Sequence, residues 1–197
     1  MRLTIARYYT PSGRCIQKPY TPGDEEDYAG DLLHRFQSGE FYSADSIKHE
    51  GPEYHTKLGR VVYGGGGITP DIFVPEDTSG YTSYYKEAAI RGLLLSYAYQ
   101  YTDENRAVLS TKGDMPTLAQ YLSRQGLVEK FAAWADKNGL KRRNLMIQKS
   151  HRLLDEYITC RIIYNMQSER ALTEYLNQRD PVVKEALRVF NEGLKDN

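Results

Sequence analysis

The chain has 197 residues, of which 40% are hydrophobic and 26% are charged, a composition typical of a globular protein with a sizeable core. Its 26 Lys and Arg residues balance 26 Asp and Glu residues, so net charge gives no argument for a nucleic acid or an anionic membrane as partner. No apolar run approaches the roughly 20 residues that span a bilayer, and the N-terminus has no apolar signal-peptide region.

The chain opens with alternating apolar residues, Leu3, Ile5 and Tyr9, which predict a strand. A turn is predicted over residues 10–13, because Pro11 presets φ and Gly13 can take a positive φ. A short return strand is expected over residues 14–17. Because natural domains seldom begin a strand at residue two, we expect this chain to start inside a larger protein.

Residues 18–58 differ in character from the strands on either side. They contain an acidic run at residues 24–27, a short predicted helix over residues 30–37, and few apolar residues after Ser38. This pattern predicts an insertion that lies over the surface. Strands are expected again at residues 60–63 and 68–75; the second is bracketed by prolines, which favours an edge position.

The region after residue 80 is predicted to be helical, because its apolar residues recur at intervals of three and four. The last helix has the clearest signals, with Asp180 as N-cap and Pro181 at the first position. The second is expected to end at Asn138 and Gly139, and the third to run from about residue 145 to 165. The apolar stripes of the five helices are Ile90, Leu93, Leu94, Tyr97 and Tyr101; Val128, Phe131, Ala132 and Ala135; Leu154, Ile158 and Ile162; Leu172 and Leu176; and Val183, Ala186, Leu187, Phe190 and Leu194.

These elements predict an α+β fold: a small sheet with an insertion, followed by a helical region. The predicted division is residues 1–80 against residues 81–197. The two cysteines, Cys15 and Cys160, lie far apart in the sequence. We expect two unpaired thiols, since two cysteines provide no disulfide framework.

Two serine–lysine patterns were weighed as nucleophilic sites. Ser83-Tyr-Tyr-Lys86 fits the S-x-x-K pattern of penicillin-recognising enzymes, but the S-D-N and K-T-G partners of that pattern do not occur. Ser12 and Lys18 could face each other across the turn, but Ser12 is expected to serve the turn itself. We therefore assign no catalytic residue.

Three other groups of residues have a functional reading and a structural one. The glycines at residues 64–67 lack the G-K-[ST] ending of a phosphate loop, and a turn is favoured. The cations at residues 141–143 follow a helix end, where they suit the negative dipole terminus. The histidines and acids of the insertion match no metal-ligand spacing, so surface positions are expected for His34, His49, His55, Asp45 and Glu50.

The two most specific segments are Ala6-Arg-Tyr-Tyr-Thr-Pro-Ser-Gly-Arg14-Cys-Ile-Gln17 and Gly67-Ile-Thr-Pro-Asp-Ile-Phe-Val74. Extended to residues 3–17 and 65–74, they resemble, in the right order, two segments of the C-terminal processing peptidases, also called tail-specific proteases. In that family they belong to the α/β catalytic domain, just after the catalytic lysine. The resemblance therefore implies that residues 1–80 are a β-sheet remnant of this domain.

The same resemblance implies what lies outside the chain. The family cleaves peptide bonds with a Ser–Lys pair, in which a buried neutral lysine deprotonates the serine. Both residues and the PDZ domain precede the matched segments in the family, so we expect upstream peptidase and PDZ segments as partners. The resemblance implies no cofactor and no metal, protein or peptide substrates for the parent, and a periplasmic or cell-envelope location.

Two hypotheses follow from these observations. In the first, the chain is the non-catalytic C-terminal portion of a serine peptidase, and it completes the sheet of the catalytic domain. In the second, the amphipathic helices form an assembly or partner-binding module, with a homodimer as one form. The departure from the family is the long stretch between the two matched segments, which the family often spans with few residues.

Overall fold

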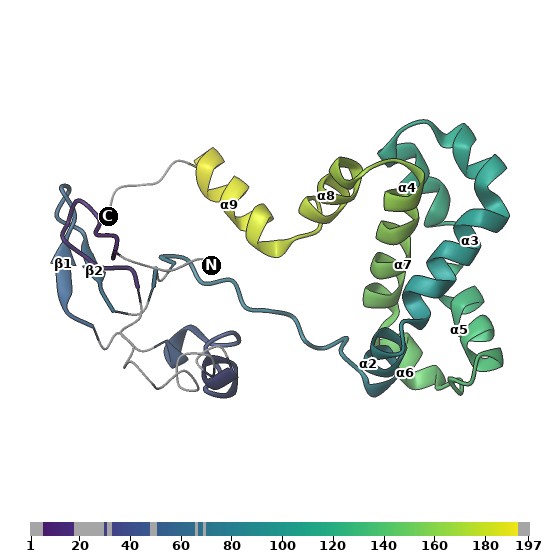
Figure 1. Ribbon diagram of the computed structural model, residues 1–197, viewed down its shortest axis with the longest axis horizontal. Helices are drawn as coiled ribbons and strands as arrows, with labels where there is room; N and C mark the ends of the chain where they lie inside the picture. Colours follow the sequence, from purple (N-terminus) through teal and green to yellow (C-terminus); the bar gives the residue numbers. More distant parts are fainter. Residues whose placement is uncertain are drawn as a thin grey trace. The chain divides into compact units, whose positions relative to one another are not determined.

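A computed structural model of the chain describes residues 6–17, 30, 33–47, 51–65, 67–68 and 70–192 (Figure 1). The chain divides into two compact units, Met1–Glu76 and Asp77–Asn197. The described residues are mostly helical, with one small antiparallel sheet of two strands. This is the α+β fold class that the sequence predicts.

The sheet of the first unit is a hairpin of β1 (Glu53–His55) and β2 (Val61–Tyr63), in which Tyr54 lies opposite Val62. The prediction of a strand at residues 60–63 is thus confirmed. β1 was not predicted; residues 53–55 fall inside the predicted insertion, where no strand was expected. The predicted helix over residues 30–37 is helical at residues 30 and 33–37, and a 3-10 turn, η1, follows at Ala44–Ser46.

Two other predicted strands are not strands in the structure. Residues 14–17 make a single bridge, between Tyr9 and Cys15. The opening strand predicted over residues 2–9 has only this bridge at residues 6–9, and its first four residues lie outside the described part. Residues 70–75 have no strand conformation. Pro70 and Pro75 cannot donate ladder hydrogen bonds, and no neighbouring strand pairs with this segment among the described residues.

The second unit is helical, and α3 and α7 lie side by side at its centre (Figure 1). Its elements are α2 (Ser83–Ile90), α3 (Leu93–Leu109), the 3-10 turn η2 (Ser110–Lys112), α4 (Met115–Leu122), α5 (Leu127–Lys137), α6 (Asn144–Lys149), α7 (His151–Met166), α8 (Glu169–Asn177) and α9 (Pro181–Glu192). The helices α3, α5 and α7 each bury an apolar stripe, as expected of helices around a shared core. The largest fully buried side chains include Tyr84, Phe131, Leu94, Leu122, Leu154, Ile158 and Ile162.

Two of the predicted helices are interrupted where the sequence pattern runs on. Gly92 takes a φ of 68° and separates α2 from α3, so Ile90 leaves the stripe and is 86% exposed. The helix predicted from about residue 145 to 165 is divided at Ser150 into α6 and α7. The buried Ser150 hydroxyl donates to the carbonyl of Gly80 at 2.7 Å and lies 2.7 Å from the Thr82 hydroxyl.

The remaining helices agree with the sequence to different degrees. The stripe of α5 is buried, and its helix ends before Gly139, which has a φ of 84°. α4 was missed, although Asp114 caps it and accepts from the Thr117 amide at 2.9 Å. α8 buries Ala171 and Tyr175, one residue before the predicted Leu172 and Leu176.

α9 begins as predicted, with Pro181 in first position and Asp180 accepting from the Val182 amide at 2.7 Å. None of its residues is buried, and Leu187 and Phe190 are 56% and 76% exposed. The last predicted stripe residue, Leu194, lies outside the described residues. No helix among the described residues is long and apolar enough to cross a membrane.

Candidate functional site

The first segment that carries the family resemblance forms a tight hairpin loop. The Thr10 amide donates to the Arg14 carbonyl at 2.9 Å, and the Gly13 amide donates to the Thr10 carbonyl at 2.8 Å. Gly13 has a φ of 84°, as the sequence predicted for this turn. The Ser12 hydroxyl lies 2.8 Å from the Thr10 hydroxyl, so Ser12 serves the loop. Its imagined partner, Lys18, lies outside the described residues.

The loop between β1 and β2 repeats this geometry. The Thr56 amide donates to the Arg60 carbonyl at 2.9 Å, the Gly59 amide donates to the Thr56 carbonyl at 2.9 Å, and Gly59 has a φ of 81°. Both loops have the sequence T-x-x-G-R. Each is a three-residue hairpin connection whose last residue is in the left-handed region, a position that favours glycine.

The first matched segment meets the start of the second beside the hairpin. The Gly65 amide donates to the Cys15 carbonyl at 3.4 Å, and the Arg14 guanidinium donates to the Tyr63 carbonyl at 3.2 Å. The Gly64 amide donates to the carbonyl of Pro52, at the start of the hairpin, at 3.0 Å. The amides of Gly64 and Gly65 therefore donate to backbone carbonyls of the first unit and do not form a phosphate-binding loop.

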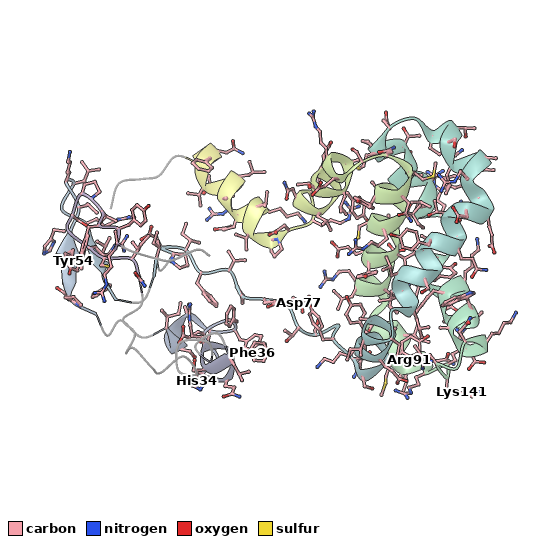
Figure 2. The ribbon with its side chains drawn as sticks, viewed as in Figure 1. His34, Phe36, Tyr54, Asp77, Arg91 and Lys141 are labelled. Carbon is pink, nitrogen blue, oxygen red and sulfur yellow. The ribbon has the colours of Figure 1, made fainter. Side chains whose placement is uncertain are left out.

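Tyr54 occupies the centre of this junction, and Figure 2 labels its side chain. A Cβ on Gly64 would lie 2.8 Å from the Tyr54 ring, and one on Gly13 would lie 3.9 Å from it. A Cβ on Gly51 would lie 1.6 Å from the Gly64 carbonyl oxygen. We call the contact of Gly13, Gly51, Tyr54, Gly64 and Gly65 the glycine junction. The sequence analysis missed Gly51 and Tyr54, although the repeated T-x-x-G-R loop was a signal for this hairpin.

The first unit exposes several apolar side chains. Tyr8 is 82% exposed, Leu58 93% and Ile68 68%, and the only buried apolar side chain among the unit's described residues is that of Val62. Exposed apolar side chains at this density mark an interaction surface in a folded protein. A two-stranded sheet is also only marginally stable by itself.

The residues weighed as catalytic or metal-binding do not form a site in the described part of the chain. The Ser83 hydroxyl donates to the Met146 thioether at 3.2 Å, and Lys86 is exposed. His34, Asp45 and His55 are exposed, and no group of metal-ligating side chains occurs among the described residues. His49 and Glu50 lie outside them.

Both cysteines are free, in line with the expectation of unpaired thiols. Cys160 is buried in α7, and its thiol donates to the Tyr157 carbonyl at 3.1 Å. Burial raises the pKa of the Cys160 thiol to about 11. A thiol that keeps its proton is a poor nucleophile, so Cys160 has the character of a core residue.

The cations at residues 141–143 lie where α5 gives way to α6, and Figure 2 labels Lys141 together with Arg91. Arg142 pairs with Glu129 at 2.5 Å, and Arg143 pairs with Glu87 at 3.4 Å. Arg91 donates to the carbonyls of Asn138 and Gly139, the two residues that follow α5, at 3.0 and 3.1 Å. The sequence predicted cations beyond this helix end only at residues 141–143, and Arg91 was missed.

Comparisons with known proteins add one finding, and it concerns the helical unit. Residues 84–168 match the model of a family of unknown function, DUF8443. This range runs from the second residue of α2 to the second residue after α7 and contains most of the helical core. No curated protein and no solved structure matches the chain.

Proposed function

We propose that this chain is the non-catalytic C-terminal portion of a serine endopeptidase of the C-terminal processing type. The observation that carries the proposal is the glycine junction. The two segments that resemble this family are separated by almost fifty residues (17 to 65), yet the Gly65 amide donates to the Cys15 carbonyl at 3.4 Å. This backbone hydrogen bond places the two segments next to each other, as neighbouring parts of one sheet would be.

In this proposal, the first unit completes the sheet of the peptidase domain. Upstream strands of the parent cover the exposed side chains of Tyr8, Ile68 and Ile72, which are 82%, 68% and 43% exposed. Burying one such side chain contributes about 1.5–3 kcal/mol, so several together suffice to hold the segments in place. The role of this chain is then structural, and we assign none of its residues to bond cleavage.

The chemistry belongs to the upstream part of the parent. There a serine and a desolvated lysine hydrolyse peptide bonds in the C-terminal tails of proteins, without cofactor or metal. The proposal includes a parent located in the periplasm or cell envelope. These properties rest on the resemblance of residues 3–17 and 65–74.

Reconstitution tests the proposal. The chain is mixed with the upstream Ser–Lys segment of the parent, and cleavage of an unstructured peptide is measured with each part alone and with both. We expect cleavage with both parts only. If the Ser–Lys segment is fully active without this chain, the proposed role is wrong.

Two matched variants connect the assay to the glycine junction. Gly51→Ala places a Cβ against the Gly64 carbonyl and should abolish the reconstituted activity. Gly30→Ala is the control, because the nearest atom to its added Cβ is 3.7 Å away, an ordinary contact. Equal activity of the two variants would contradict the proposed role of the junction.

A second candidate function is an assembly or partner-binding module, and α9 favours it. Its exposed side chains include Val182, Leu187 and Phe190, which lie on a helix that buries no residue. Such a face is typical of a helix that packs against a partner. Light scattering over a range of concentrations tests the homodimer. Self-association that is lost in the double variant Leu187→Ser with Phe190→Ser would support a homodimer through α9. A strict monomer at all concentrations would exclude the homodimer.

A further inference from the structure

One end of the helical unit exposes aliphatic side chains that its own core does not use. Ile90 in α2 is 86% exposed and Leu145 in α6 is 78% exposed, the two most exposed aliphatic side chains among the described residues of this unit. Met146 is 37% exposed. Single exposed aliphatic residues are ordinary, but a group of them at one place indicates an interaction surface.

Two side-chain contacts join α2 to α6 and to the residue before it. α2 packs against α6. The Ser83 hydroxyl donates to the Met146 thioether at 3.2 Å, and Glu87 pairs with Arg143, just before α6, at 3.4 Å. Ile90 follows Glu87 by three residues and therefore lies on the same side of α2. We call Lys86, Ile90, Arg143, Leu145, Met146 and Lys149 the α2–α6 face.

Positive charge is in excess around this face, although the whole chain has a net charge of zero. The two helices, the C-cap of α2 and the loop before α6 carry six cations, Lys86, Arg91, Lys141, Arg142, Arg143 and Lys149. Three acids, Glu87, Glu129 and Asp136, are within ion-pair distance of four of them, which leaves an excess of three positive charges. Lys86 and Lys149 are exposed and have no ion pair within the described part of the chain.

We propose that the α2–α6 face is a docking surface for an acidic polypeptide segment that also carries apolar side chains. Each helix presents an aliphatic residue and a lysine four positions away: Lys86 with Ile90, and Leu145 with Lys149. A partner helix with carboxylates beside leucines complements both features. A nucleic acid would complement the charge alone, since its backbone offers phosphates and sugars. This proposal concerns the helical unit and does not rest on the peptidase proposal.

Fluorescence anisotropy of a labelled synthetic peptide with Glu and Leu at helical spacing tests this proposal on the full chain. We expect binding that weakens with added salt, because exposed charges are screened. A matched peptide with Lys in place of every Glu should not bind. Equal binding of the two peptides, or no binding of the acidic one, overturns the proposal.

Variants locate the bound peptide on the protein. Lys86→Glu with Lys149→Glu reverses two exposed charges and should weaken binding about tenfold or more. Ile90→Ser with Leu145→Ser should weaken it to a similar degree, about tenfold, through lost apolar contact. Tyr99→Ser with Val108→Ser removes exposed apolar side chains from α3 and should leave the affinity unchanged. If the α3 pair has the larger effect, the proposed face is wrong.

A membrane is the competing partner for a basic face with exposed aliphatic residues. Sedimentation with vesicles of phosphatidylcholine and phosphatidylserine, compared with vesicles of phosphatidylcholine alone, distinguishes it. We expect little sedimentation with either. Strong sedimentation with the anionic vesicles, lost in Lys86→Glu with Lys149→Glu, together with no peptide binding, would assign the face to lipid and overturn the proposal.

Discussion

At the scale of single residues, Arg91 connects parts of the helical unit that lie far apart in the sequence. Its guanidinium donates to the carbonyls of Asn138 and Gly139 and to the Glu87 carboxylate at 3.0, 3.1 and 3.3 Å. Asn138 and Gly139 directly follow α5, where a cation also meets the negative end of the helix dipole. Arg91 therefore fixes the end of α5 against the end of α2.

We expect Arg91→Ala to lower the free energy of unfolding by about 1 kcal/mol, since the side chain is partly exposed and water replaces some of its hydrogen bonds. Urea unfolding followed by far-UV circular dichroism measures this loss. Arg106→Ala is the control, because Arg106 pairs only with Asp103 on the surface of α3. Its effect should stay within about 0.5 kcal/mol. Equal losses in the two variants would contradict the capping role.

The buried thiol of Cys160 makes stability depend on pH in the alkaline range. Its pKa of about 11 in the folded chain compares with about 8.5 for an unfolded thiol. Between these values the unfolded chain has lost the proton and the folded chain keeps it, so the free energy of unfolding falls as pH rises.

We expect Cys160→Ala to flatten this fall, by about 1–2 kcal/mol between pH 8 and 10. Urea unfolding of both proteins at several pH values measures the difference. The tyrosines with raised pKa values, such as Tyr175, contribute equally to both proteins and cancel. Parallel pH profiles would contradict the assignment of Cys160 as a protonated core thiol.

At the scale of elements, the two T-x-x-G-R loops depend on a glycine in the left-handed region. An L side chain costs roughly 1–2 kcal/mol in that conformation. Gly13→Ala and Gly59→Ala should therefore each weaken their own hairpin by about 1 kcal/mol. Steric clashes add nothing to this cost, because a Cβ on Gly59 has no atom within 4 Å and one on Gly13 makes only ordinary contacts at 3.9 Å.

Amide hydrogen exchange measures this effect locally. Gly59→Ala should speed exchange of the Thr56 amide about fivefold or more, and Gly13→Ala should do the same for the Thr10 amide. Gly30→Ala is the control and should change neither. A uniform change in both hairpins from either variant would show that the loops do not act separately.

The same elements show how far the sequence could be read. Periodicity predicted the stripes of α5 and α7, and the capping signal Asp180–Pro181 predicted the start of α9, because these signals are local. Periodicity did not predict the helix breaks at Gly92 and Ser150. These breaks depend on a left-handed φ at Gly92 and on a Ser150 hydroxyl that donates to Gly80, about 70 residues away. The glycine junction could not be predicted from the sequence either, since only the fold brings Gly51 next to Gly64.

At the scale of the whole molecule, the two units differ in how much core each possesses. The buried apolar cluster lies entirely between Tyr84 and Tyr175, in the helical unit. In the first unit, Val62 is the single buried apolar side chain among the described residues. A domain needs its own core to fold alone; the second unit has one, whereas the described residues of the first unit do not form one.

We therefore expect residues 77–197, expressed alone, to unfold in one cooperative transition. Trp134, the only tryptophan of the chain, is packed against Phe131 and Tyr97 of the core and reports on that transition by fluorescence. Residues 1–76 alone should show no cooperative transition by circular dichroism, because a two-stranded sheet buries too little apolar surface to offset the conformational entropy of ordering it. A cooperative transition in the first fragment would mean that it holds its fold without further strands, and the peptidase proposal would lose its structural reason. Absence of a cooperative transition in residues 77–197 would contradict the helical core described for this unit. The two outcomes can be told apart, because each is measured on a separate fragment.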